Sequence, residues 1–322
     1  MKLPKIFKRV LTAGLAFAFA VGVAGCGGGG DKGGMINIAT GGTAGTYYPI
    51  GGAIADVLSK NVEGMNASAQ STGASVANIN MLKEGEVDLA IVQNDIAYYA
   101  VNGTDMFDKK VDNLRAIASL YPETCQFVTL ETSDVRSIAD LKGKKVAVGA
   151  AGSGVEANVR QILKAYGLTY DDIDEQFLSF AEGAAALKDG AVDVACLTAG
   201  TPTASVQDVA SQHKIRLIPL TNDKIEQLIA EYPFYTKTTI PAGTYQGFDE
   251  DIQTVSVMAI LVANDKVDDD KGYAITKAIF DNLDKIQASH AAAKKIQKDT
   301  ATSGLDFMPM QKGAEKFYKE QK

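Results

Sequence analysis

Tryptophan is absent from this chain of 322 residues, and histidine occurs only twice, at His213 and His290. Chemistry that relies on a histidine base therefore has little to draw on. Lysine and arginine, 32 together, are outnumbered by 39 aspartates and glutamates, which leaves a net charge of −7. This balance argues against a nucleic-acid partner. No Walker A, H-E-x-x-H, H-x-E or C-x-x-C motif occurs, so we expect neither a metal ion nor a cofactor.

Cysteine is also scarce, and the first of the three cysteines lies at the end of an apolar run. Basic residues within positions 2–9 precede this run at positions 10–23, which has signal-peptide length but is too short for a comfortable membrane span. The segment ends in Val-Ala-Gly-Cys, which matches a bacterial lipobox with Cys26 as the lipidated residue. We expect residues 1–25 to be a lipoprotein signal peptide and residues 26–34 to be the lipidated cysteine and a Gly-rich tether. The mature protein is then extracytoplasmic and anchored to the cell membrane.

The other two cysteines, Cys125 and Cys196, both lie in apolar runs that read as strands. An oxidising compartment permits a disulfide between them, but nothing in their spacing requires one. We expect two buried free thiols, and neither resembles a catalytic nucleophile.

Residues 36–51 combine a strand, a turn and the start of a helix. An alternating apolar run is followed by a turn rich in glycine, hydroxyl groups and tyrosine, and Pro49 then precedes apolar positions at helical spacing. A Gly-rich turn that opens a helix presents free backbone N–H groups and a positive dipole end, which suits an anion. The alternative is a tight turn that needs glycine only for its backbone conformation.

The chain repeats this unit, which favours two related lobes. Residues 187–195 closely echo residues 82–90, and the order of elements recurs with them. Further predicted strands, each followed by a polar or Gly-rich turn and a helix, cover residues 65–70, 87–92, 145–149 and 176–180 and a run ending at Thr198. The pattern predicts an α/β fold in which each lobe is a mostly parallel sheet flanked by helices.

The predicted domain organisation follows from this repeat. Residues 35–125 form the first part of lobe I, residues 126–250 form lobe II, and residues 251–322 return to lobe I. Residues 127–130 read as a crossover strand, and residues 252–263 read as the returning strand, with helices near 273–286 and 291–296 behind it.

Helix boundaries can be predicted at several of the turns. Asp95 is placed to cap the helix that follows residues 87–92, and Thr201 to cap a helix with Pro202 at its first position. Gly85 is placed to end the helix before it.

Ligands of such sheets bind beyond the carboxyl ends of the strands, and all six turns lie at those ends. If the lobes face each other, the turns converge on one cleft, where a small-molecule site is expected. Their hydroxyls, glycines and tyrosines favour binding over reaction, with Gln93, Asp95 and Glu182 as further polar groups.

Two features of the turn at residues 150–154 could indicate catalysis, but both are weaker than the evidence for binding. Residues 152–157 fit a loose G-x-G-x-x-A dinucleotide fingerprint, but a single match is weak evidence and the compartment is wrong for NAD. Ser153 has no G-x-S-x-G elbow and no histidine within reach in the turns. We therefore expect a binding protein and not an enzyme.

Several motifs together resemble the TAXI family of TRAP-transporter solute-binding proteins, over essentially the whole mature chain. The matching segments are 39–51 (ATGGTAGTYYPIG), 71–78 (STGASVAN), 85–95 (GEVDLAIVQND), 121–123 (YPE), 199–203 (AGTPT) and 241–245 (PAGTY). Each segment alone is weak, and their combination is specific.

The resemblance implies a two-lobe periplasmic-binding-protein-like fold of type II, with a ligand cleft between the lobes. It also implies a carboxylate ligand such as glutamate, glutamine or 2-oxoglutarate, and delivery to a TRAP permease driven by an ion gradient, with small and large integral subunits. Carried over position by position, the ligand-binding residues are Thr43, Tyr47, Tyr48, Ser71, Ser75, Gln93, Asp95, Ser153, Gly154, Glu182 and Thr198. The turns contain no arginine, and the family is associated with hydroxyls and backbone amides instead.

The expected mechanism is lobe closure by a monomer around its ligand. Two other functions stay open from the sequence: a ligand sensor that presents its bound form to a signalling receptor, and an exported enzyme of the same fold.

Overall fold

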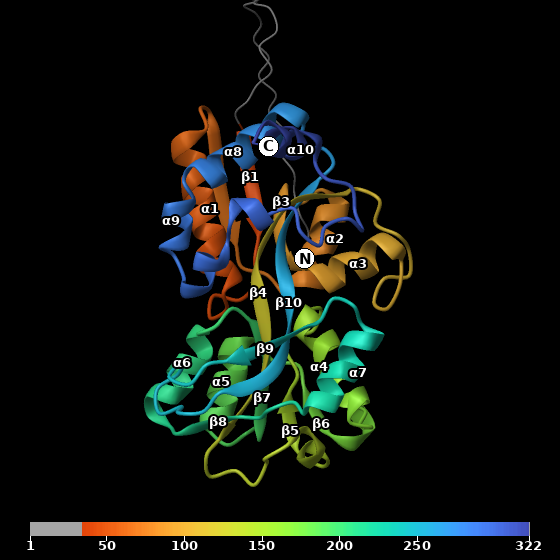
Figure 1. Ribbon diagram of the computed structural model, residues 1–322, viewed down its shortest axis with the longest axis vertical. Helices are drawn as coiled ribbons and strands as arrows, with labels where there is room; N and C mark the ends of the chain where they lie inside the picture. Colours follow the sequence, from red (N-terminus) through yellow and green to blue (C-terminus); the bar gives the residue numbers. More distant parts are fainter. Residues whose placement is uncertain (1–33, 322) are drawn as a thin grey trace, which may run out of the picture. The chain divides into compact units, whose positions relative to one another are not determined.

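Two long antiparallel strands, β4 (Leu114–Leu130) and β10 (Ile252–Asn264), run side by side through the middle of the sheet (Figure 1). The structure is a computed structural model that describes residues 34–321. Within them, ten strands form one sheet, in the order β2-β1-β3-β10-β4-β7-β5-β6, with β8 paired to β4 and β9 paired to β10. The predicted signal peptide, Cys26 and nearly all of the tether lie outside the described residues.

Lobe I lies at one end of the two long strands. Its parallel strands are β1 (Gly34–Ala39), β2 (Met65–Gln70) and β3 (Leu89–Gln93). Its α-helices are α1 (Tyr47–Asn61), α2 (Ser75–Glu84), α3 (Asn94–Asn102), α8 (Asp269–Asp281), α9 (Leu283–Gln287) and α10 (Lys312–Glu320). Two apolar cores hold these helices on the sheet, one packing α1 and α8 against β1 and the other packing α2 and α3 against β3. The returning C-terminal helices pack on lobe I, as predicted.

Lobe II lies at the other end. Its parallel strands are β5 (Lys145–Ala147), β6 (Asp174–Gln176) and β7 (Val194–Ala199), and its antiparallel strands are β8 (Ile215–Leu217) and β9 (Thr236–Ile240). The helices are α4 (Gly154–Ala165), α5 (Phe180–Lys188), α6 (Ala204–Gln212) and α7 (Asn222–Glu231). Apolar residues of α4 at helical spacing, Val155, Val159 and Ile162, pack into its core. Lobe II also has its own buried clusters.

Several predicted boundaries are confirmed. The strand at residues 65–70 matches β2, and β10 extends the predicted strand 252–263 by one residue. Gly85 ends α2 with a left-handed φ of 77°. The predicted crossover strand 127–130 is only the end of β4, so the predicted division after residue 125 falls inside a strand that both lobes share.

Three predicted boundaries are wrong. The strand predicted at residues 176–180 ends at Gln176, because Ser179 and Glu182 form a capping box that starts α5 at Phe180. Asp95 is not a helix cap: α3 begins at Asn94 after Gln93, and the Asp95 carboxylate accepts a hydrogen bond from Asn158 of lobe II instead.

The helix predicted to begin at Pro202 starts only at Ala204. Thr203 adopts the extended backbone of an N-cap residue, with φ −96° and ψ 134°. Its hydroxyl donates to the Gly200 carbonyl and its backbone N–H donates to the Tyr245 hydroxyl, which fixes this residue ahead of the helix.

Cys125 and Cys196 are free and buried, as expected. Among residues 34–321, no helix is both long and apolar enough to cross a membrane.

Candidate ligand-binding site

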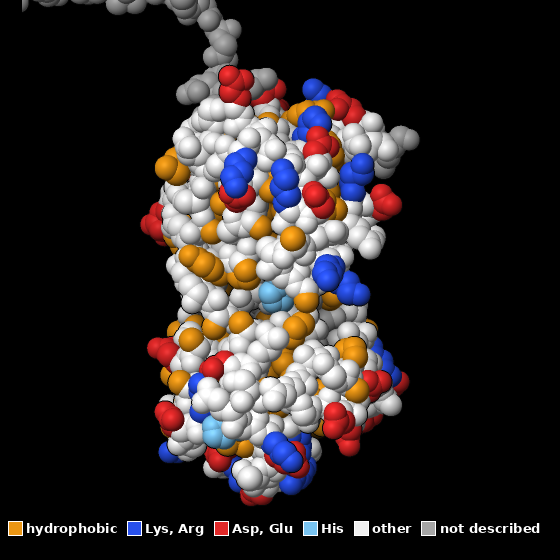
Figure 2. Space-filling view, turned by 90° about the vertical axis from the view of Figure 1, so that its left-hand side faces the viewer, with side chains coloured by type: hydrophobic (Ala, Val, Ile, Leu, Met, Phe, Trp, Pro, Cys, Tyr) orange, Lys and Arg blue, Asp and Glu red, His pale blue; other side chains and the backbone are white. Residues whose placement is uncertain are grey.

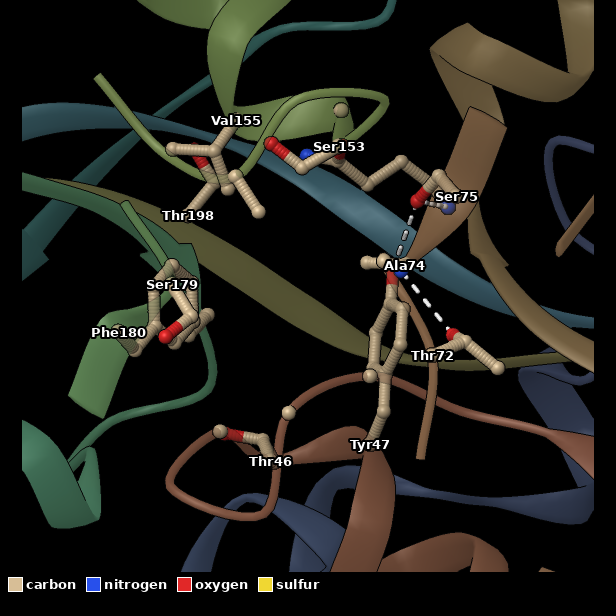
Figure 3. Close-up of a pocket in the computed structure, with 18 of the residues that line it drawn as sticks. Thr46, Tyr47, Thr72, Ala74, Ser75, Ser153, Val155, Ser179, Phe180 and Thr198 are labelled. Atoms are coloured by element: carbon tan, nitrogen blue, oxygen red, sulfur yellow. Dashed lines mark hydrogen bonds between the residues drawn. The ribbon is translucent and has the colours of Figure 1, made fainter. Parts of the chain in front are cut away.

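A cavity of about 70 Å³ lies where the turns of the two lobes meet (Figure 3). Space of this size holds on the order of five water-sized groups. Five of the six turns predicted from the sequence contribute to its wall, and Ser179 and Phe180, which were predicted to end the strand 176–180, line it in place of the sixth. The lining residues are Gly41, Gly42, Gly45, Thr46, Tyr47, Thr72, Gly73, Ala74, Ser75, Gln93, Glu123, Ala150, Ser153, Gly154, Val155, Ser179, Phe180, Thr198 and Ala199.

Four helices begin at this wall. The first residues of α1, α2, α4 and α5 are Tyr47, Ser75, Gly154 and Phe180, and all four line the cavity. The positive ends of four helix dipoles therefore lie around one small space. No lysine, arginine or histidine is among the lining residues. An anion in this cavity would be bound by helix dipoles and neutral hydrogen-bond donors in place of a cationic side chain.

Hydroxyl groups extend this donor set. The Ser75 hydroxyl accepts a hydrogen bond from the Gln93 backbone N–H at 3.1 Å and lies 3.5 Å from the Tyr47 hydroxyl. The Ser153 Oγ is buried and has no hydrogen-bond partner among the described residues. An unpaired buried hydroxyl is costly unless a bound molecule satisfies it, which makes Ser153 a candidate ligand contact.

One carboxyl group lies in the wall, that of Glu123, which belongs to the matching segment 121–123 but is not among the predicted ligand-binding residues. Glu123 of β4 is only 2% exposed, and its Oε1 accepts a 2.6 Å hydrogen bond from the Tyr47 hydroxyl. Burial raises the pKa of Glu123 well above its usual value, against the opposing effect of the Tyr47 hydrogen bond. Burial likewise raises the pKa of Tyr47.

The two lobes touch on several sides of the cavity. The backbone N–H groups of Val76 and Ala77 in lobe I donate to the Gly152 carbonyl in lobe II. The Thr46 hydroxyl donates to the Gly200 carbonyl at 3.2 Å. These bonds cross between the lobes, so the lobes are closed around the cavity.

A buried polar network adds to this contact. Asn158 of α4 accepts a hydrogen bond from the Gln93 side chain at 2.7 Å and donates to Asp95 Oδ2 at 2.8 Å and to the Tyr235 hydroxyl at 2.9 Å. The Tyr235 hydroxyl donates to Gln161. Burial raises the pKa of Asp95 to about 6, although the hydrogen bond from Asn158 lowers it. Asp95 thus joins the lobes from behind the cavity wall.

The predicted ligand-binding residues divide into two groups. Six line the cavity: Tyr47, Ser75, Gln93, Ser153, Gly154 and Thr198. Five do not: Thr43, Tyr48, Ser71 and Glu182 are exposed, and Asp95 is buried behind Gln93.

Physical reasons separate these positions. Tyr48 follows Tyr47 by one residue on α1 and so faces another direction. Glu182 is committed to the capping box, where its carboxylate accepts hydrogen bonds from the Ser179 hydroxyl and backbone N–H. Glu123, Thr46 and Phe180 line the cavity but are not among the predicted ligand-binding residues. A charged residue inside the apolar run of β4 was the signal available for Glu123.

Among the described residues, no group of histidine, cysteine, aspartate and glutamate side chains is arranged to hold a metal ion.

The mixed sheet flanked by helices, with a cavity between two lobes, defines a periplasmic-binding-protein-like fold of type II. The chain belongs to the NMT1-like family, whose sequence model matches residues 38–321.

Solved structures share this fold at low sequence identity. A protein of Bordetella bronchiseptica RB50 matches with a TM-score of 0.54 at 18% identity, over 90% of this chain and 83% of that one. PhnD1 of Prochlorococcus marinus (MIT 9301), solved in complex with methylphosphonate, matches with a TM-score of 0.51 at 15% identity, over 80% of this chain and 90% of that one. A Listeria monocytogenes protein assigned to an L-cystine ABC transporter matches with a TM-score of 0.51 at 14% identity, over 82% of this chain and 98% of that one.

Proposed function

We propose that this protein is an extracytoplasmic solute-binding protein that captures a small carboxylate by lobe closure and delivers it to a membrane permease. The observation that carries the proposal is the cavity into which four helices direct their N-termini. Negative charge is favoured at such ends, and a carboxylate is small enough for the space. No covalent chemistry is needed.

Closure supplies the mechanism. A ligand held by turns of both lobes binds the closed state better than any open one, and this differential affinity shifts the population toward closure. The glutamate, glutamine or 2-oxoglutarate class and a TRAP-type permease rest on the sequence motifs that resemble the TAXI family. A lipid anchor at Cys26 would keep the protein beside that permease.

The surface where the lobes meet is compatible with this role. Uncharged side chains, many of them hydrophobic, cover much of the surface between the lobes (Figure 2). Charged side chains are spread over both lobes in the same view, and one group of lysine or arginine side chains lies beside the waist at the right-hand edge.

The first experiment is thermal unfolding of the purified protein, freed of co-purified ligand, against amino acids, 2-oxo acids and dicarboxylates. A ligand at a thousand times its Kd adds about 4 kcal/mol of stability. This corresponds to a rise in Tm of roughly ten degrees. Flat curves across the whole panel would remove the carboxylate assignment and leave only the fold.

Replacing Ser153 with alanine is expected to weaken binding of the ligand so identified by about 1–2 kcal/mol, or roughly 5- to 30-fold. The reason is that the buried Ser153 hydroxyl has no partner in the described chain and would lose its contact with the ligand. Isothermal titration calorimetry measures the change, with Ser211→Ala, an exposed hydroxyl on α6, as the control. An unchanged Kd would exclude Ser153 from the site.

A further inference from the structure

Among residues 34–321, Glu123 is the only one that brings a carboxyl group to the cavity wall, and one of its two oxygens already accepts a hydrogen bond. Oε1 accepts the hydrogen bond from the Tyr47 hydroxyl. Oε2 accepts no hydrogen bond from residues 34–321, and it is not among the oxygens that protein atoms enclose. Oε2 is therefore the atom of Glu123 that a molecule in the cavity can reach.

The surroundings of Glu123 disfavour a negative charge. The titratable groups that face it are all acids: Tyr47 from α1, Tyr121 and Cys125 from β4, and Asp95 from α3. Within the described part of the chain, no cationic side chain lines the cavity. An ionised Glu123 would be a buried anion with no cation beside it, which is unfavourable even with the hydrogen bond from Tyr47. Burial and the nearby Asp95 both raise the pKa of Glu123, which favours its neutral form.

We propose that Glu123 is a ligand-binding residue that acts as a neutral carboxylic acid and donates a hydrogen bond from Oε2 to the carboxylate of the bound ligand. This role rests on the proposed function. Tyr47 determines which oxygen carries the proton, because its hydroxyl occupies Oε1 as a donor. An O–H···O⁻ bond is short and about twice as strong as a neutral one, so Glu123 supplies part of what an arginine would provide elsewhere. An acid kept neutral by its pocket is an established way to make a carboxyl group donate.

The arrangement has a second consequence for the ligand. A ligand carboxylate next to Glu123 makes ionisation of Glu123 still less favourable, so the bound complex holds the proton more firmly than the free protein. Affinity therefore falls as the pH rises toward and above the pKa of Glu123, while the ligand itself stays ionised.

Two substitutions of similar size separate a donor from an acceptor at this position. Glu123→Gln keeps an oxygen for Tyr47 and places an N–H₂ donor where Oε2 was. Glu123→Leu removes both. We expect Glu123→Gln to bind L-glutamate and 2-oxoglutarate within about threefold of wild type, and Glu123→Leu to lose 10- to 100-fold. The Kd of each probe is measured by calorimetry from pH 6 to pH 9. Wild-type affinity should fall relative to Glu123→Gln as the pH rises.

The outcomes are distinct. If Glu123→Gln loses as much affinity as Glu123→Leu, Glu123 acts as an ionised acceptor and the proposal is overturned. A selective loss of L-glutamate in Glu123→Gln would overturn it too, because it would show a carboxylate that holds the ligand ammonium. If the wild type binds neither probe nor any other carboxylate of the panel, the proposed function fails and this role fails with it. If Glu123→Leu does not fold, wild type against Glu123→Gln still tests the proposal, because a loss of affinity of much more than about threefold in Glu123→Gln would overturn it.

Discussion

Replacing Gly154 with alanine is expected to remove ligand capture while leaving the unliganded protein folded. Gly154 opens α4 in lobe II, and a Cβ added there would overlap Gln93 Oε1 of lobe I. The same Cβ would lie 2.5 Å from Gln93 Cδ and 2.8 Å from Ile96 Cγ1. The atoms it meets belong to the other lobe, so the overlap arises only when the lobes close. Overpacking of this kind costs on the order of 3 kcal/mol, which lowers affinity by about 100-fold or more.

Calorimetry with the ligand found by thermal unfolding measures the loss, and circular dichroism checks the fold. Gly52→Ala is the matched control, because Gly52 lies in α1 with no atom within 4 Å of an added Cβ. It should bind as the wild type does. Wild-type affinity in Gly154→Ala would show that the closed contact between Gly154 and Gln93 is not needed for capture.

Replacing Asp95 with asparagine is expected to stabilise the protein at pH 7. Asp95 is 1% exposed, and burial raises its pKa from 3.8 to about 6. Between these values the folded chain binds a proton that the unfolded chain has released, so the free energy of unfolding falls as the pH rises through about 4 to 6. The lost stability is on the order of 3 kcal/mol at pH 7. Asparagine at this position keeps an acceptor for Asn158 and carries no charge.

Urea unfolding at pH 4 and pH 7 tests this sign. The gain of Asp95→Asn should reach about 1–3 kcal/mol at pH 7 and nearly vanish at pH 4. Asp112→Asn changes an exposed aspartate in the same lobe and should give no difference between the two pH values. A variant less stable than wild type at pH 7 would mean that the charged form of Asp95 is needed by Asn158.

The position of the cavity could be predicted from the sequence because of one topological rule. Turns that follow parallel strands meet at the same sheet edge, so the three turns of each lobe had to lie near one another, and turns of both lobes share one cavity because the lobes face each other. Tyr47, Ser75 and Ser153 line the cavity for this reason.

The direction of individual side chains could not be predicted in the same way. Asp95 and Glu182 follow strands as Gln93 and Ser153 do, yet Asn158 of the other lobe binds Asp95 and Ser179 binds Glu182. The second of these was readable, since Ser-x-x-Glu is a capping-box signature. The first depends on how the lobes meet. Glu123 lies within a strand, and only the pairing of β4 with β10 and β7 brings its carboxyl to the junction.

The sharing of β4 and β10 between the lobes has a consequence for how the chain folds. Leu114 pairs with Asn264 and Thr124 with Ser256, so more than a hundred residues separate the partners along the chain. Lobe I cannot complete its sheet until β10 has been synthesised, whereas most of lobe II lies between the two strands. Pairing over such a separation slows folding, because a large loop must be closed before the contacts form. Completion of lobe I is therefore limited by a strand that begins only at Ile252.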